Sequence, residues 1–421
     1  MKVKQVFSFF IIASLVMFLF GCEEDEPFSE PNYDDDIILH EMWPFPVGVA
    51  VPGGRTSNVS GGAATNNALL DSNPQHQFLR HFNVVVSENE MKPDSILPSS
   101  RPAKDPSEWE AGDFNWTHAD ALVDYAYANN KGVRFHTLIW HAQTPSWFFP
   151  GTSVGTGTDR MNALYAHMEH YIRVVMERYK DRVKYWDVVN EAVDHDTSGA
   201  RMDSEYTKIM IAAGKTGINR YEYIVKAFEW AREYGNNDIE LYLTDFGIER
   251  PFTRGGTTKQ GDFKLLVEYL IQNDAPIDGV GFQGHFRLYD HPVDQISAGI
   301  DLFAALQRNS VPLKVQICEL DISVFSNAKG ENNDTEIANE NLEQRLKDLA
   351  QTYRDYFNMF EQKYNAGKLN AVVIWGIADG HSWLNDHPLR NRTDYPLLFN
   401  RNYKAKDAYV ALTTNRPGFP Q

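Results

Sequence analysis

The stretch Trp186-Asp187-Val188-Val189-Asn190-Glu191 ends a hydrophobic run abruptly in an amide and a carboxylate. Residues 183–189 are rich in β-branched and aromatic side chains and contain no glycine or proline, which is typical of a short buried strand. The preceding segment has apolar residues every three or four positions, as on one face of a helix: Leu164, Met168, Tyr171, Val175 and Tyr179. Helix then strand is the unit of an α/β barrel, in which polar groups at the C-terminal strand ends face solvent or ligand. On its own, the hexapeptide is explained equally well by a helix N-terminus capped by Asn190.

A second stretch, residues 313–321, is also an apolar run that ends in carboxylates. Glu319 and Asp321 are two positions apart, so they share one face of the expected strand. Glu191 and Glu319 thus both lie at predicted strand ends, far apart in sequence. Two such glutamates are what carboxylate-pair chemistry on a sugar acetal requires.

Strand and helix patterns alternate eight times along the chain, which predicts a single (β/α)8 TIM barrel of the α/β class. Residues 45–421 are the expected catalytic domain, with enlarged βα loops at residues 192–220 and 325–340. The eight expected strands cover residues 47–51, 82–86, 133–140, 183–189, 239–244, 277–282, 311–320 and 371–374.

Six short motifs occur in one order, at residues 88–92, 136–141, 186–191, 281–285, 318–321 and 375–383. Through these motifs, residues 45–412 resemble the family 10 glycoside hydrolases, which are mostly endo-1,4-β-xylanases. The resemblance implies retaining, double-displacement cleavage of internal β-1,4-xylosidic bonds. It implies Glu191 as the general acid/base and Glu319 as the nucleophile, with carboxyl groups about 5 to 5.5 Å apart.

The same resemblance implies a set of substrate-binding residues. They are Glu88, Asn89, Lys92, His136, Trp140, Gln143, Asn190, Gln283, His285, Trp375 and Trp383. Asn190 would bind the sugar 2-hydroxyl, and His285, oriented by Asp321, would hold the ionised Glu319. Without the resemblance, a charged helix start would explain the first three residues better and a satisfied core histidine would explain His136 better, while packing would explain the two tryptophans equally well.

Two further features of the sequence lie near the expected site. Thr244-Asp245-Phe246-Gly247 stands where the family usually has Asn-Asp-Tyr-Asn, which predicts weaker contacts on the leaving-group side. Cys318 precedes the expected nucleophile, and strand alternation predicts that its side chain faces the helix layer.

The net charge of -17 argues against nucleic acid as a partner and suits an uncharged polymer, here xylan and xylo-oligosaccharides. The thirteen histidines form no His-x-His or His-Glu-x-x-His pattern, so we expect no metal and no cofactor. A monomer is expected. Two alternatives stay open: a retaining hydrolase of another β-1,4-glycan, and a non-catalytic cell-surface polysaccharide-binding protein.

The N-terminus is typical of an export signal, because Lys2 and Lys4 precede an apolar run over residues 6–20. The run ends in Leu-Phe-Gly-Cys, which resembles a bacterial lipoprotein cleavage site. We therefore expect a signal peptide at residues 1–21, lipidation of Cys22, and an acidic flexible tether at residues 22–44. This predicts a membrane-anchored lipoprotein that faces the periplasm or the cell exterior. An ordinary signal peptide with an incidental Cys22 is the alternative.

Overall fold

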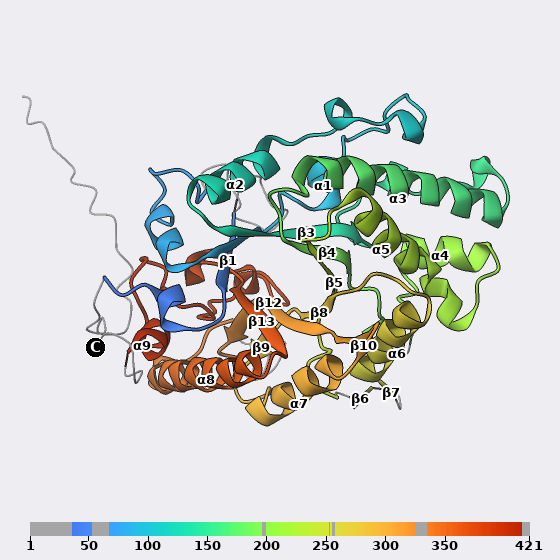
Figure 1. The fold of residues 1–421 in the computed structure, drawn as a ribbon. Coiled ribbons are helices and arrows are strands. Elements are labelled where there is room, and N and C mark those ends of the chain that lie inside the picture. Colours follow the sequence, from blue (N-terminus) through green and yellow to red (C-terminus); the bar gives the residue numbers. More distant parts are fainter. Residues whose placement is uncertain are drawn as a thin grey trace, which may run out of the picture.

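The computed structural model describes residues 36–52, 67–195, 199–251, 253–254, 257–325 and 335–414. Eight parallel strands form a closed barrel in the order β13-β1-β2-β3-β4-β5-β8-β12, and β12 pairs with β13 to close it (Figure 1). The strands are β1 (Val47–Val51), β2 (Val84–Ser87), β3 (Gly132–Trp140), β4 (Tyr185–Asn190), β5 (Glu240–Asp245), β8 (Gly279–Phe282), β12 (Lys314–Ser323) and β13 (Leu369–Ile374). The predicted (β/α)8 barrel is confirmed.

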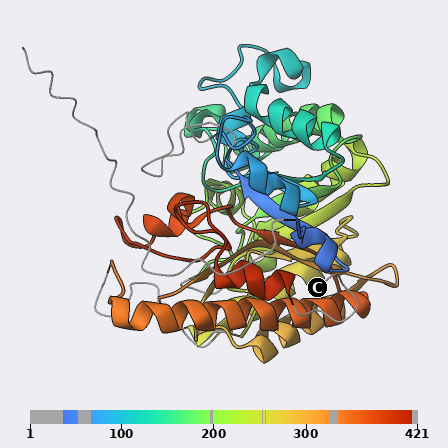
Figure 2. The ribbon, with the colours of Figure 1, turned by 90° about the vertical axis from the view of Figure 1, so that its left-hand side faces the viewer.

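Helices surround the barrel, and the long α8 runs along one side of the molecule (Figures 1 and 2). They are α1 (Pro93–Ile96), α2 (Thr117–Ala128), α3 (Gly157–Tyr179), α4 (Glu205–Ala212), α5 (Glu222–Tyr234), α6 (Lys259–Gln272), α7 (Val293–Ala304), α8 (Asn339–Asn365) and α9 (Asp407–Thr413). The predicted apolar stripe of α3 is buried along its length. Its first turn is fixed by a capping box, in which Thr156 and Asp159 satisfy each other's backbone N–H groups. None of the described helices is long and apolar enough to span a membrane.

The barrel interior contains an unexpected polar network. Arg134 on β3 is almost fully buried and donates hydrogen bonds to Asp187 on β4 and Gln316 on β12. Gln316 in turn donates to the Tyr242 hydroxyl, at 2.9 Å. A side chain at Gly281 would place its Cβ 3.1 Å from the Arg134 guanidinium, so glycine leaves room for this buried cation. A buried charge persists only when it is paired and hydrogen-bonded, as Arg134 is.

Cys318 differs from its prediction. Its Sγ is buried on the interior side of the barrel, 3.1 Å from where a Cβ at Gly281 would lie, and donates to the Phe282 carbonyl at 3.2 Å. The expectation that it faces the helix layer is wrong, because the β12–β13 register shifts between Ile317 and Leu320. This irregularity breaks strict alternation, so Cys318 and Glu319 do not point to opposite faces.

Two further segments differ from the prediction. Val311–Pro312 pairs with Gln307–Arg308 in a separate short antiparallel hairpin, and the Leu313 N–H also donates to the Leu306 carbonyl, so the barrel strand starts only at Lys314. The segment 192–220, expected as a polar loop, contains α4, whose Tyr206 packs on Phe149.

The tether was expected to reach residue 44. However, Leu39, Met42 and Trp43 are buried in the main hydrophobic core, so packed structure starts before residue 45. The signal peptide, Cys22 and residues 22–35 lie outside the described residues.

Candidate active site

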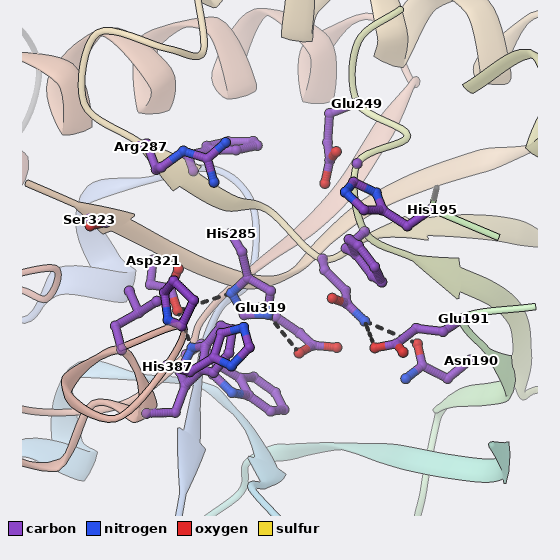
Figure 3. Close-up of a pocket in the computed structure, with 18 of the residues that line it drawn as sticks. Asn190, Glu191, His195, Glu249, His285, Arg287, Glu319, Asp321, Ser323 and His387 are labelled. Atoms are coloured by element: carbon purple, nitrogen blue, oxygen red, sulfur yellow. Dashed lines mark hydrogen bonds and ion pairs between the residues drawn. The ribbon is translucent and has the colours of Figure 1, made fainter. Parts of the chain in front are cut away.

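A cleft of about 660 Å³ opens at the C-terminal ends of the barrel strands. All fourteen site residues predicted within the barrel line it: Glu88, Asn89, Lys92, His136, Trp140, Gln143, Asn190, Glu191, Gln283, His285, Glu319, Asp321, Trp375 and Trp383. They come from the ends of β2, β3, β4, β8, β12 and β13, which parallel strand order brings to one rim. The side chains of Glu319 and Glu191 point toward one another across the cleft (Figure 3).

Glu319, on β12, is held through one oxygen by an imidazole. His285 Nε2 lies 3.2 Å from Glu319 Oε2, and His285 Nδ1 lies 3.0 Å from Asp321 Oδ2 (Figure 3). Trp383 Nε1 also donates to Asp321 Oδ2, at 2.8 Å. Burial alone would lower the pKa of His285, but the charges of Asp321 and Glu319 and their hydrogen bonds raise it to about 10. His285 is therefore an imidazolium at neutral pH, and both its N–H groups donate to carboxylates.

A second histidine approaches the other oxygen of Glu319. His136 Nδ1 is 2.9 Å from Asp187 Oδ2 and 3.8 Å from Glu319 Oε1. Asp187 is the carboxylate that Arg134 binds inside the barrel, so the polar network reaches the cleft through His136. Glu319 Oε1 is buried and accepts no hydrogen bond from any described residue.

Glu191, just beyond β4, accepts two hydrogen bonds through its carboxylate. Gln283 Nε2 donates to Oε1 at 2.9 Å and Trp140 Nε1 donates to Oε2 at 3.1 Å. Burial raises the pKa of the Glu191 carboxyl, but these two hydrogen bonds and the charges of His141 and Arg201 outweigh it, so the pKa lies below its usual value. The free site thus favours the ionised form of Glu191.

Asn190 lies beside Glu191 and is fixed through its carbonyl. Its Oδ1 accepts from Thr244 Oγ1 at 2.9 Å and from Gln283 Nε2 at 3.2 Å. This pair of donors orients the amide and keeps its Nδ2 for a ligand. Thr244, which stands where the family usually has asparagine, was not predicted to support the site.

The β2 side of the cleft carries a buried charged cluster. Lys92 Nζ donates to Asn89 Oδ1 at 3.0 Å and lies 5.0 Å from the centre of the Trp140 ring. Burial raises the pKa of Glu88 to about 7, partly offset by the positive charge of Lys92. Burial likewise lowers the pKa of Lys92. Several carboxylates oppose this lowering, and the charge of Glu319 has the largest effect among them. Polar groups held in place on the wall of a cleft in this way are suited to hydrogen-bonding sugar hydroxyls.

The opposite side of the cleft contains residues that sequence reasoning largely missed. Phe246 lies between the His195 ring, with centroids 5.2 Å apart, and the Lys259 ammonium, 3.4 Å from the ring centre. Lys259, from the first turn of α6, also forms a 2.7 Å ion pair with Asp245. In the sequence, only the difference from the family pattern at residues 244–247 pointed to this side of the cleft. Other unpredicted residues that line the cleft are Glu249, Arg250, Phe286, Arg287, His291, Ser323, His387 and Arg392.

A parallel barrel that places a histidine-held carboxylate opposite a second, hydrogen-bonded carboxylate defines the class of carboxylate-pair glycoside hydrolases. The sequence matches the glycosyl hydrolase family 10 model over residues 55–415. The chain belongs to this family.

Individual relatives agree with the family match. The chain is 36% identical over 398 residues to endo-1,4-β-xylanase C of Paenibacillus barcinonensis, covering 93% of this chain but only 34% of that protein. It is 35% identical to the thermostable celloxylanase of Thermoclostridium stercorarium, covering 87% of this chain and 84% of the relative. The crystal structure of xylanase B from Clostridium stercorarium F9 superposes with a TM-score of 0.71 at 34% identity, covering 90% of this chain and 100% of that one.

Proposed function

We propose that the protein is an endo-1,4-β-xylanase that cleaves internal bonds of xylan with retention of configuration. The observation that carries the proposal is the state of Glu319: His285 binds one carboxylate oxygen, while the other is buried and accepts no hydrogen bond from the described residues. Such an oxygen is available to attack an anomeric carbon. The names of the family relatives support xylan as the polymer.

In the first step Glu319 Oε1 bonds to the anomeric carbon while Glu191 gives a proton to the departing glycosidic oxygen. The imidazolium of His285 binds one oxygen of Glu319 and so fixes the orientation of the carboxylate. Bound sugar displaces water from the cleft, and the negative charge of Glu319 then favours the protonated form of Glu191. Asn190 Nδ2 would donate to the 2-hydroxyl, a contact that strengthens in the oxocarbenium-like transition state.

In the second step Glu191 acts as a base. The glycosyl-enzyme bond removes the charge of Glu319, so the hydrogen bonds from Gln283 and Trp140 again favour ionised Glu191. The carboxylate takes a proton from water, which attacks the anomeric carbon and releases the sugar with its original configuration.

Two substitutions distinguish these roles. Glu191→Ala removes general acid catalysis, which contributes a factor of about 10² to 10⁴ to the rate. The loss matters less when the substrate has a good leaving group. This variant should therefore nearly abolish xylan cleavage and still form glycosyl-enzyme from an activated aryl xylobioside, with added azide giving the β-glycosyl azide. Glu319→Ala cannot form that intermediate and should give the α-glycosyl azide by direct inversion. Equal losses on both substrates and a common azide anomer would refute the assignment.

The choice of polymer needs its own measurement. Reducing-sugar release from linear xylan, compared at equal concentration with cellulose and with mannan, tests the substrate. We expect xylan to be cleaved much faster than the other two. Comparable rates on cellulose or mannan would favour another β-1,4-glycan.

We further propose that the enzyme is a monomer held on a membrane by lipid on Cys22. The support is the sequence alone: two lysines, the apolar run over residues 6–20, and the Leu-Phe-Gly-Cys end of that run. Several acyl chains on one residue hold a protein firmly on a bilayer. The anchored domain would face the periplasm or the cell exterior, and shedding by protease added to intact cells would indicate the exterior.

A further inference from the structure

Arg201 is a partly buried cation next to Glu191 that the two-step mechanism above does not use. The chain leaves β4, forms an antiparallel bridge between Val193 and Ala200, and so returns to the cleft. Arg201 follows this bridge, and its backbone N–H bonds to the Ala192 carbonyl at 3.2 Å. Its side chain is 13% exposed, so solvent screens its charge weakly.

The backbone of Glu191 has an unusual conformation that Arg201 helps to fix. Glu191 has a φ of 55°, in the left-handed region that residues other than glycine rarely adopt. Its N–H donates to the Thr244 carbonyl at 2.9 Å, and its carbonyl accepts from Arg201 Nε at 3.0 Å. Such a conformation persists only where surrounding contacts determine it, and these two bonds hold the residue on both sides.

The guanidinium also faces the carboxylate itself. Arg201 Nη2 lies 3.9 Å from Glu191 Oε2 and has no hydrogen-bond acceptor among the described residues. Arg201 Nη1 lies 3.9 Å from Asp203, a carboxylate that is 70% exposed and therefore a well-screened competitor. An ionised Glu191 would gain from this nearby positive charge, whereas a protonated one would not.

From this geometry we infer that Arg201 is a positioning residue that fixes the backbone of Glu191 and favours its ionised carboxylate, so that it promotes the second, water-attack step over the first. The inference rests on the proposed role of Glu191 as acid/base. Other charged or titratable groups near Glu191 come from every neighbouring element: His141 after β3, Lys92 at α1, Asp245 on β5, Lys259 on α6 and Glu319 on β12. Arg201 differs from all of them in also binding the Glu191 backbone.

The test is the pH profile of three variants. Arg201→Met removes the charge and the Nε donor, and we expect the basic limb of kcat/KM on xylohexaose to move up by about one pH unit. On an activated aryl xylobioside, where the second step limits turnover, kcat near pH 6 should fall about tenfold. Arg201→Lys keeps the charge, so its limb should move less than half as far. Asp203→Asn removes the competing carboxylate, and its limb should move down.

Arg220→Met is the matched control, since Arg220 lies in the same segment and contacts Met202 rather than Glu191. Its limbs should coincide with those of the wild type. Unmoved limbs in Arg201→Met, or an upward shift in Asp203→Asn, would overturn the inference. If Arg201→Met does not fold, Arg201→Lys and the exposed Asp203→Asn still decide it. The reaction of Glu191→Ala with azide is run in parallel. If no β-glycosyl azide forms, the acid/base role of Glu191 is refuted. If it forms but the basic limb of Arg201→Met does not move, only the role of Arg201 is refuted.

Discussion

Replacing Asp321 by Asn should release the proton of His285 at a much lower pH. In the wild type the pKa of His285 is raised from 6.5 to about 10, a difference of 3.5 units or about 5 kcal/mol at 1.36 kcal/mol per unit. Asp321 is the larger of the two sources of this rise, ahead of Glu319, and its side chain is fully buried. We therefore expect its removal to lower the pKa of His285 by about two units.

The asparagine is a close match in shape. Its amide oxygen can still accept from both donors that Asp321 Oδ2 serves, His285 Nδ1 and Trp383 Nε1. The change thus removes charge more than packing. Asp290→Asn is a suitable control, because Asp290 lies near His285 in the chain but pairs with Arg287 and Arg250.

The assay should report on His285 and not on Glu191. An aryl xylobioside with a very good leaving group needs no general acid, so the basic limb of its kcat/KM reports the imidazolium that holds Glu319. That limb should move down by about two pH units in Asp321→Asn and stay in place in Asp290→Asn. NMR of the imidazole nitrogens should show the same shift directly. A neutral His285 at pH 7 in the wild type, or an equal pKa in Asp321→Asn, would refute the electrostatic reasoning.

The same shift predicts a pH-dependent stability. Because the pKa of His285 is higher in the folded than in the unfolded chain, its contribution is fully present below about pH 6.5 and is lost as the pH rises through about 10. Asp321→Asn should therefore lower the free energy of unfolding by about 2 to 3 kcal/mol at pH 6 and by less at pH 10. Urea unfolding at both pH values measures this difference.

Three further changes have defined outcomes. Glu88→Gln should stabilise the fold relative to the wild type by about 1 to 3 kcal/mol above pH 7. The reason is that the pKa of Glu88 is raised to about 7, so the folded wild type loses stability as the pH rises from about 4.5 to 7. Thermal unfolding as a function of pH measures this difference. Phe246→Tyr restores a hydroxyl on the leaving-group side and should improve kcat/KM on long xylo-oligosaccharides about two- to tenfold more than on aryl xylobiosides, and equal effects would contradict it. Cys22→Ser should move the protein from the membrane to the soluble fraction, because the acceptor thiol is lost.

The two glutamates could be found from sequence because each ends an apolar strand, and strand ends of a parallel barrel meet at one rim. The interior ion pair was within reach too. Arg134 and His136 are two positions apart in a predicted strand, so they share the interior face, and Asp187 lies in the neighbouring predicted strand. A buried arginine requires a buried partner, which a reading of the strand faces could have named.

Other features could not be predicted, because they depend on contacts between distant segments. The bridge between Val193 and Ala200 that delivers Arg201 has no periodic pattern, and Lys259 reaches Phe246 from a helix start. Because of the irregularity before Leu320, Cys318 and Glu319 do not point to opposite faces, although strict alternation predicted that they would. The tether boundary was a different kind of error, since apolar residues such as Leu39 within an acidic stretch did indicate packing.

The two carboxylates are held in different ways, and the difference fits their proposed tasks. Glu319 is bound by His285, which Asp321 of the same strand orients, and His136 beside it connects to the Arg134 network inside the barrel. These partners all stabilise one charge state, as a nucleophile needs until its bond forms. Glu191 lies one residue beyond its strand, and its hydrogen-bond donors at 2.9 and 3.1 Å are uncharged, while the nearest guanidinium is 3.9 Å away. A group that gives up and regains a proton in each turnover needs two accessible charge states, which uncharged donors and a more distant cation allow.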